Sequence, residues 1–246
     1  MTKNIELKEF PRSQKYDFEW MCKNEMGPNS IWLTEFLTNE MDLKPGMKVL
    51  DIGCGMAMSS IFLAKEFGVE VWATDLWISA TDNLKRIKNE GLEDQIYPIH
   101  ADVHSLPFPY DFFDAIVSIG AYHYFGTDEI FFLEFSKYLK SNGQIGIVVP
   151  GLLNEFDNVP NELRDVWDNE FYTFHSIDWW RRHLEKTGLV KIEKADTLPN
   201  SWDIWMKWEK ALKESGLCKR NGDTELLLAD NGKYLTFPRL IARKKI

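Results

Sequence analysis

The stretch Val49-Leu50-Asp51-Ile52-Gly53-Cys54-Gly55-Met56-Ala57 decides the fold of this chain. Its first residues are mostly apolar, as in a buried strand, and a glycine turn follows directly. Glycines at these two positions let the backbone turn sharply and approach a ligand, because no Cβ stands in the way. A strand that delivers such a turn to the start of a helix is typical of ligand sites in α/β proteins, and the alternative is an ordinary strand-to-helix turn.

Strand-like and helix-like patterns alternate along the rest of the chain. Strands are expected at residues 48–52, 70–73, 96–100, 113–119, 144–149, 189–195 and 234–242. Helices are expected at residues 16–23, 31–41, 57–67, 80–89, 128–139, 176–186 and 202–215. This alternation predicts an α/β fold whose Rossmann-like, mostly parallel sheet of seven strands is flanked by helices.

The chain is expected to form a single domain. Its 246 residues suffice for one large α/β domain, and no repeat or low-complexity linker divides them. We expect an N-terminal helical cap at 1–45 and a ligand-binding core at 46–150. Residues 151–246 should complete the sheet and add further insertions to the cap.

The composition argues against several classes of partner. A formal net charge of -9 gives no reason to approach a polyanion, so no nucleic-acid partner is expected. Residues 1–20 carry charges throughout, and no apolar run is long enough to span a bilayer, which predicts a cytoplasmic protein without an integral membrane segment. Cys22, Cys54 and Cys218 are widely spaced, so neither a disulfide framework nor a metal site is expected.

Two further acidic residues follow the next two strands. Asp75 comes 24 residues after Asp51 (75 minus 51), where a carboxylate can accept hydrogen bonds from both hydroxyls of a ribose. Asp102 follows the third strand and is suitably placed to accept a hydrogen bond from an adenine amino group. Successive strands therefore bring acids to the carboxyl edge of the sheet, which is where open α/β sheets bind their ligands.

From about Met47 to Val149 the chain resembles the class I S-adenosylmethionine-dependent methyltransferases. The resemblance implies that S-adenosylmethionine is the cofactor and that the glycine turn with Asp51 lines its methionine portion. It also implies that Asp75 binds the ribose and Asp102 the adenine. Where the family motif often has a third glycine, this chain has Ala57. The full expected cofactor site consists of Asp51, Gly53, Cys54, Gly55, Asp75, Leu76, Asp102, Val103 and Ser118.

Two other functions compete with methyl transfer. A nicotinamide-dinucleotide oxidoreductase would also use Asp75, but its fingerprint needs a small residue where this chain has Met58. Asp51 would also repel a pyrophosphate, whereas it suits a cofactor that carries an ammonium and a sulfonium. The second alternative is a module that binds S-adenosylmethionine without catalysis.

The segment Ser118 to Gly126 leaves the fourth strand and is expected to face the methyl group. It resembles the corresponding loop of the cyclopropane-fatty-acid and mycolic-acid branch of the methyltransferases, although His123 replaces the glutamate of that branch and Tyr124 its histidine. His123 is the candidate general base, because an imidazole titrates near neutral pH. Tyr122 and Tyr124 are candidates for ring contacts with the sulfonium or with a cationic acceptor. All three side chains are alternatively packed core residues.

The acceptor is expected to be a small or lipid-like molecule held beneath the cap. Most of the chain's ten tryptophans lie outside the nucleotide-binding units, and Trp202, Trp205 and Trp208 share one side of a helix. Such a side is either a packing face or a wall of the acceptor site. Methylation at nitrogen, oxygen, sulfur or carbon is left open, as is the oligomeric state.

Overall fold

A seven-stranded sheet forms the centre of the molecule, in the strand order β3-β2-β1-β4-β5-β9-β7. The computed structural model describes residues 7–217 and 222–246. The strands are β1 (Lys48–Ile52), β2 (Glu70–Asp75), β3 (Ile96–His100), β4 (Phe113–Ile119), β5 (Leu139–Val148), β7 (Val190–Thr197) and β9 (Pro238–Lys244). Only β9 runs antiparallel, and it pairs with β5 on one side and β7 on the other. The prediction of a mostly parallel, Rossmann-like sheet of seven strands is confirmed.

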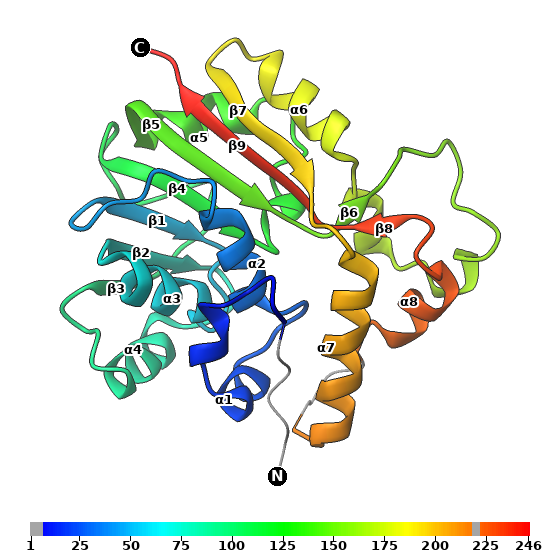
Figure 1. The fold of residues 1–246 in the computed structure, drawn as a ribbon. Coiled ribbons are helices and arrows are strands. Elements are labelled where there is room, and N and C mark those ends of the chain that lie inside the picture. The colour runs from blue at the N-terminus through cyan, green and yellow to red at the C-terminus, as the bar shows by residue number, and fades with distance from the viewer. Residues whose placement is uncertain (1–6, 218–221) are drawn as a thin grey trace.

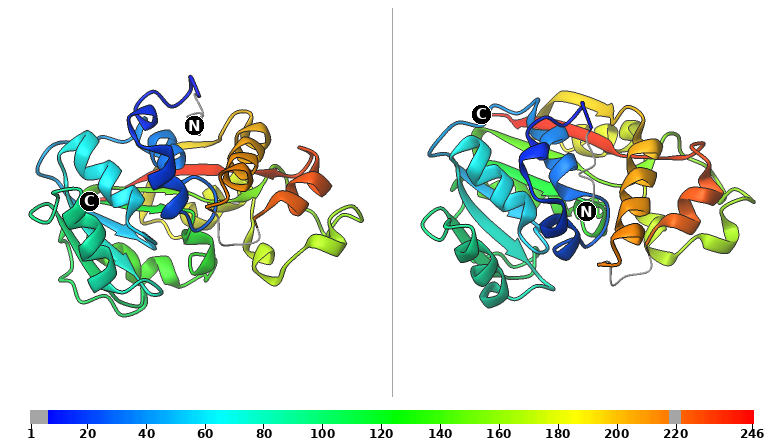
Figure 2. Two further views of the ribbon diagram at one scale, coloured as in Figure 1. Left: turned by 90° about the horizontal axis from the view of Figure 1, so that it is seen from below. Right: turned by 60° about the horizontal axis from the view of Figure 1, so that its bottom comes forward.

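Helices cover both faces of this sheet (Figures 1 and 2). The first face is covered by α2 (Ser30–Thr38), α3 (Met58–Phe67) and α4 (Ala80–Asn89), which share a hydrophobic core with alternate strand residues such as Val49 and Val117. The opposite face is covered by α5 (Phe131–Phe135) and α6 (Ile177–Glu185). Because side chains alternate across a strand, the neighbours Leu50 and Ile116 belong to this second core.

A cap stands beside the carboxyl ends of the strands. Its helices are α1 (Phe18–Lys23), α7 (Ser201–Ser215) and α8 (Thr224–Asp230), and a small sheet of β6 (Gly151–Leu152) and β8 (Leu235–Thr236) joins it to the core. The N-terminal helices lie next to α7 (Figures 1 and 2). Trp208 of α7 packs edge-on against Trp32 at 5.5 Å between ring centroids, and its Nε1 donates a 3.1 Å hydrogen bond to the carbonyl of Gly27.

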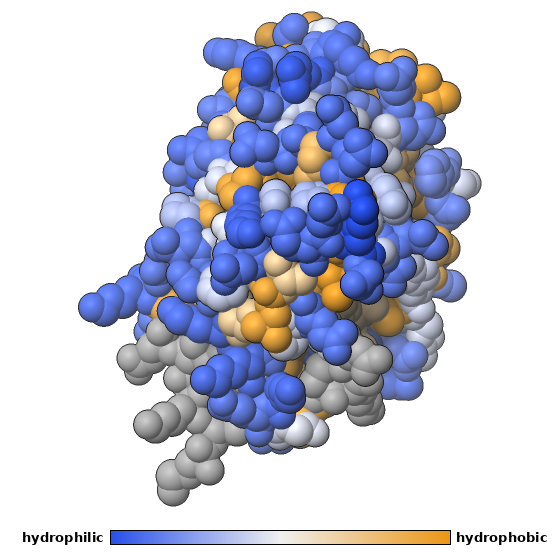
Figure 3. All heavy atoms as spheres, turned by 90° about the vertical axis from the view of Figure 1, so that its right-hand side faces the viewer, coloured by the Kyte–Doolittle hydropathy of each residue, from blue (hydrophilic) through white to orange (hydrophobic). Residues whose placement is uncertain are grey.

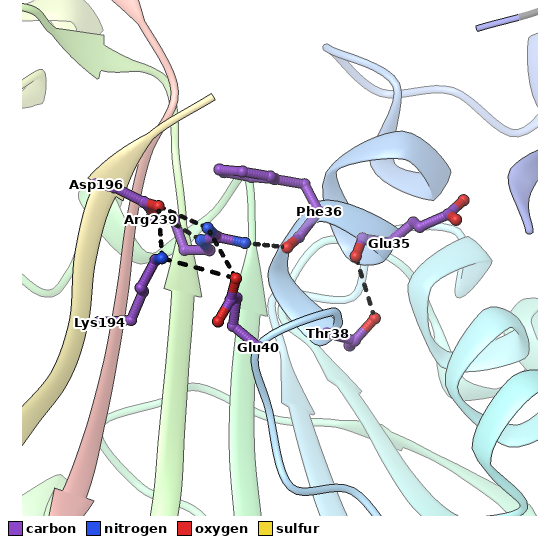
Figure 4. Close-up of polar contacts among 7 residues, drawn as sticks. All are labelled: Glu35, Phe36, Thr38, Glu40, Lys194, Asp196 and Arg239. Atoms are coloured by element: carbon purple, nitrogen blue, oxygen red, sulfur yellow. Dashed lines mark hydrogen bonds and ion pairs between the residues drawn. The ribbon is translucent and has the colours of Figure 1, made fainter. Parts of the chain in front are cut away.

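An ion-pair network fastens α2 to the antiparallel part of the sheet (Figure 4). The guanidinium of Arg239 is 5% exposed and donates to both carboxylate oxygens of Asp196, at 2.8 and 2.6 Å. It also donates to the carbonyl of Phe36 and lies over that residue's ring, 3.8 Å from the centroid. Asp196 belongs to β7 and Phe36 to α2. The buried Arg239 guanidinium therefore links the edge strand β7 to the N-terminal helix α2.

The structure differs from several of the expected elements. The helix expected at 128–139 is reduced to α5 and a 3-10 turn, because β5 already begins at Leu139. Residues Ser141 to Gly143, which precede the strand expected at 144–149, lie inside β5, where Asn142 adopts a left-handed φ of 65° beside a shift in register. The last expected strand is divided at Phe237 into β8 and β9, and neither α8 nor β6 was expected.

The surface on the side of α7 and α8 is mostly hydrophilic, and hydrophobic residues reach it only in small groups (Figure 3). Among the aromatic residues of the cap, Trp205 and Trp208 are buried, whereas Tyr172 is 66% exposed. Cys22 and Cys54 are free and buried, and Cys218 lies outside the described residues. Within the described chain, no helix is both long and apolar enough to cross a membrane.

Candidate active site

One cavity of about 580 Å³ lies at the carboxyl ends of the central strands. Its walls come from the glycine turn after β1, the end of β2 and the loops that follow β3 and β4. Residues 24–30 and the cap complete the enclosure. This volume is within the range of about 300–1,000 Å³ that is usual for small-molecule sites.

The glycine turn is shaped by backbone hydrogen bonds to Thr74 and by the close approach of Gly53 to Ala121. Gly53 and Cys54 donate their N–H groups to the carbonyl of Thr74, at 2.8 and 3.2 Å. Gly53 has a φ of +71°, and a Cβ on it would lie 2.4 Å from the Cβ of Ala121, so no other residue fits without displacement. Ala57 caps α3 in the left-handed conformation, where the family motif often has glycine. Gly53, Cys54 and Gly55 all line the cavity.

Asp75 is buried at the end of β2 and lines the cavity. Its Oδ1 accepts the N–H groups of Trp77 and Ile78, and its Oδ2 accepts that of Gly55. These bonds fix the carboxylate in one orientation. A carboxylate has about four acceptor sites, so about one site is left for a ribose hydroxyl. Leu76, which is 52% exposed, also lines the cavity.

Asp51 lies beneath the glycine turn and is not among the residues that line the cavity. Its Oδ2 accepts the hydroxyls of Ser59 and Ser60 of α3, at 2.6 and 2.7 Å. Burial raises its pKa to about 6, against the lowering effect of those two bonds. Its Oδ1 is buried without a partner among the described residues. The carboxylate therefore ties α3 to β1, and its free oxygen leaves room for one further donor.

Ser118 does not line the cavity either. It is buried in β4, and its hydroxyl donates a 2.9 Å hydrogen bond to the carbonyl of Ile52 in the neighbouring strand. The expected cofactor contact at Ser118 is thus replaced by a bond between two strands.

Asp102 and Val103 line the cavity on the loop after β3. The Asp102 side chain is half exposed, and it accepts hydrogen bonds from the backbone N–H of His104 at 2.9 Å and from the ring Nδ1 at 2.7 Å. These bonds hold the pKa of Asp102 below its usual range. A charged acceptor therefore stands at the open end of the cavity.

The three candidate residues after β4 form the 3-10 turn η2 (Tyr122–Tyr124) but point to different places. His123 and Tyr124 line the cavity, whereas Tyr122 does not. Tyr122 is fully buried in the opposite core, where it contacts Phe131 and Trp180. Tyr122 is accordingly a core residue, and the structure leaves it no catalytic role.

His123 is a poor general base in this environment. Its side chain is 2% exposed, and burial lowers its pKa to about 3. Its Nδ1 has no hydrogen-bond partner among the described residues, and its ring packs against Tyr124 and Phe174 at 4.1 and 5.5 Å between centroids. A base works best when its pKa lies near the operating pH. The imidazole is thus a neutral wall of the cavity, and the expected proton transfer is not supported.

The cap contributes cavity residues that the sequence patterns did not single out. Their only common signal is the aromatic richness of the segments to which they belong. They are Glu170, Phe171, Phe174 and Asp223, joined by Met26 and Pro28 from the N-terminal segment. Of the three tryptophans on α7, only Trp205 lines the cavity.

The described cavity residues suit S-adenosylmethionine better than a dinucleotide. Asp75 and Asp102 offer carboxylates to hydroxyl and amino groups, and the glycine turn allows close approach. No lysine or arginine stands among the lining residues of the described chain. A pyrophosphate would find no countercharge on these walls, whereas a cofactor with a sulfonium and an ammonium needs none.

Comparisons with known proteins agree with this site. Residues 49–143 match the family of methyltransferase domains. Methyltransferase GfsG of Streptomyces halstedii is 27% identical over 67% of this chain and 60% of its own. The chain spans between 43% and 60% of the length of the first curated relatives it matches.

Solved structures share the fold at low sequence identity. Haemonchus contortus phosphoethanolamine N-methyltransferase 2 in complex with S-adenosylmethionine has a TM-score of 0.72 at 18% identity, over 93% of this chain and 56% of that one. The [4+2]-cyclase SpnF has a TM-score of 0.69 at 19% identity, over 91% and 84%. Residues 49–143 therefore match a methyltransferase domain, and the chain has a fold that these solved structures share.

Proposed function

We propose that this protein transfers the methyl group of S-adenosylmethionine to a small-molecule acceptor bound in the same cavity. The observation that carries the proposal is the continuity of that cavity. Its walls include the glycine turn, Asp75, the turn η2 and aromatic residues of the cap. Donor and acceptor would thus lie side by side in one cavity, which is the main requirement of a direct displacement.

The chain's own residues hold and orient the cofactor and the acceptor, and they exclude water from the cavity. Gly53 and Gly55 let the backbone approach the methionine portion, Asp75 accepts a ribose hydroxyl, and Asp102 with Leu76 and Val103 borders the adenine. When bound, the cofactor supplies an electrophilic methyl group on a sulfonium. Asp51 acts from beneath the turn, because it fixes the first turn of α3 through Ser59 and Ser60.

His123 contributes shape rather than proton transfer. As a neutral ring packed between Tyr124 and Phe174, it closes the cavity against water where the acceptor would meet the donor. The similarity of residues 118–126 to the cyclopropane-fatty-acid branch supports the placement of this loop beside the methyl group. Because His123 replaces the glutamate of that branch, we do not extend the similarity to cyclopropanation.

Transfer of a labelled methyl group tests the proposal. The protein is incubated with S-adenosylmethionine labelled at the methyl carbon and a metabolite extract, and labelled products are separated by mass. We expect a labelled small molecule together with S-adenosylhomocysteine. Tight binding of S-adenosylhomocysteine without any labelled product, as for a non-catalytic module or a cyclase on this fold, would refute methyl transfer.

A further inference from the structure

His123 is a polar residue in the wall of the cavity, and it is buried without a hydrogen bond. The residue is 2% exposed, it lines the cavity, and its Nδ1 has no partner within the described chain. Its ring packs against Tyr124 and Phe174, and such ring contacts leave the nitrogens unsatisfied. A buried polar group without a partner destabilises the free protein. A ligand that supplies the missing bond would remove this penalty.

Most other polar side chains of the cavity already have partners in the chain. Asp75 and Asp102 accept hydrogen bonds from neighbouring residues, and the hydroxyl of Tyr124 donates to a carboxylate at 3.2 Å. Among the described cavity residues, only Thr74 shares with His123 a buried polar atom that lacks a partner. Thr74 lies next to Asp75 at the end of β2, which is the expected ribose site. His123 is therefore the unsatisfied group on the loop after β4.

His123 stands where the glycine turn, the loop after β4 and the cap meet. Ala121, two residues earlier, lies so close to Gly53 that a Cβ on the glycine would be 2.4 Å from the Cβ of Ala121. Phe174 of the cap contacts the imidazole at 5.5 Å between ring centroids, and Trp205 of the cap lines the same cavity. A molecule held beside the glycine turn and against these rings therefore meets the imidazole.

The protonation state of His123 determines which chemical group fits it. Burial lowers its pKa to about 3, so near pH 7 the ring offers one N–H donor and one nitrogen lone pair. A hydroxyl both donates and accepts, and it can pair with either nitrogen, whichever carries the hydrogen. A carboxylate or phosphate can only accept, and the described lining residues include no lysine or arginine to balance its charge. An uncharged hydroxyl is thus the better match.

We propose that His123 determines specificity for the methyl acceptor: its imidazole forms a hydrogen bond with an uncharged hydroxyl of that molecule, whose apolar body lies against the aromatic side chains of the cap. This inference rests on the proposed function and specifies its substrate class. The hydroxyl is held in place and not ionised, because the ring takes no proton from it. His123 thereby positions the acceptor beside the methyl group without acting as a base.

Three probes with the same aromatic body test this inference by binding alone. 2-Phenylethanol carries the hydroxyl, (2-fluoroethyl)benzene replaces it with a fluorine that is a poor hydrogen-bond partner, and 3-phenylpropionate carries a carboxylate. Each is titrated at neutral pH into protein saturated with S-adenosylhomocysteine, and the affinity is measured by NMR. We expect 2-phenylethanol to bind at least about fivefold more tightly than either of the others, because only the hydroxyl satisfies the buried imidazole without bringing a charge.

Two variants of His123 separate the hydrogen bond from the shape of the ring. His123→Phe keeps a ring but removes both nitrogens, and it should reduce the preference for 2-phenylethanol over the fluorinated probe to less than about twofold. His123→Gln has an amide that still donates and accepts, and it should restore part of the preference. His183→Phe is the matched control. His183 is also buried, but it stands on α6 and does not line the cavity, so the preference should be unchanged.

The ring nitrogens of His123 give a direct readout that a purely structural role would not change. In protein labelled with nitrogen-15 at its five histidines, the His123 signals are those missing from His123→Phe. We expect 2-phenylethanol to shift them and (2-fluoroethyl)benzene to leave them in place. Equal binding of the three probes, binding of none, or unmoved His123 signals overturns the inference while the proposed function stands. If S-adenosylhomocysteine itself does not bind, the proposed function fails, and this inference fails with it.

Discussion

The backbone N–H of Gly55 donates a 2.8 Å hydrogen bond to the carboxylate of Asp75, so the glycine turn after β1 is held in place by the end of β2. The same carboxylate accepts the N–H groups of Trp77 and Ile78. Asp75 thus has two tasks, because it shapes the turn and also faces the cavity. A change at this position should affect both.

We expect Asp75→Ala to weaken the binding of S-adenosylhomocysteine by at least about tenfold, since each hydrogen bond to a charged group contributes roughly 1.5–3 kcal/mol. Asp75→Asn keeps one acceptor oxygen and should lose less. Calorimetry measures both affinities. Asp94→Ala, an exposed acid outside the cavity, serves as the control. Undiminished affinity in Asp75→Ala would remove Asp75 from the cofactor site.

Gly53→Ala should be more damaging than Gly55→Ala. The new methyl at 53 would lie 2.4 Å from the Cβ of Ala121, whereas at 55 the nearest atom is the flexible Met26 Sδ at 2.9 Å. Both carry a left-handed strain of roughly 1–2 kcal/mol. We expect Ala121→Gly to rescue part of the stability lost in Gly53→Ala, as measured by urea unfolding. A double variant no more stable than the single one would show that strain alone, and not the clash, sets the loss.

Arg239→Met should lower the free energy of unfolding by about 1–2 kcal/mol, because the Asp196 carboxylate loses its two-pronged bond and keeps only Lys194 at 3.4 Å. Asp196→Leu added to it should recover most of this loss. Arg239→Lys should not, since an ammonium cannot reproduce the two-pronged bond to Asp196. Urea denaturation compares the four proteins. A loss below about 0.5 kcal/mol in Arg239→Met would show that the network in Figure 4 contributes little to stability.

His123 should make the protein less stable as pH falls. Its pKa is about 3 in the folded state against 6.5 as the ordinary value. Between these limits the unfolded chain binds more protons, so wild-type stability declines on acidification, by up to about 1.4 kcal/mol per pH unit. His123→Phe lacks this dependence. We expect its unfolding free energy, measured relative to wild type, to rise as pH falls from 7 to 5.

Asp51 has the opposite effect on how stability depends on pH. Its pKa of about 6 lies above its ordinary 3.8, so the folded state binds more protons between those values and gains stability as pH falls. Asp51 is common to wild type and His123→Phe, and its effect cancels in their difference. If that difference is constant from pH 7 to 5, the His123 imidazole titrates in the folded state near its ordinary pKa, and its role as a base is open again.

The sequence was sufficient to predict the strands of the sheet, but not to predict where the side chain of each site residue points. Strong apolar strands and glycine turns placed β1 to β4 nearly to the residue. Tyr122 and His123 are adjacent in one turn, yet the first packs into a core and the second lines the cavity. The alternation of side chains along β4 puts Ser118 on the opposite face from Val117 and Ile119. Which of these two faces borders the cavity depends on the tertiary packing and cannot be predicted from the strand alone.

Glu170 escaped prediction for a different reason. It stands on a long excursion between β6 and α6 that has no regular periodicity, so nothing local relates it to the loop after β4. Only the folded chain brings it within 3.2 Å of the Tyr124 hydroxyl. The prediction of a helix at 128–139 was wrong because apolar residues there suit a helix and a buried strand equally well. The last residue of the segment belongs to β5, which begins at Leu139.

The position of β9 also determines when, during synthesis of the chain, the sheet can finish folding. It is the last strand in the chain, yet it is inserted between β5 and β7. Until Pro238 to Lys244 have left the ribosome, β7 lacks the strand with which it pairs in the structure, and the bond from Arg239 to α2 is missing. These pairings join distant parts of the sequence, and such contacts form slowly. Synthesis from the N-terminus therefore makes the glycine turn early but completes the sheet only after residue 244 has been added.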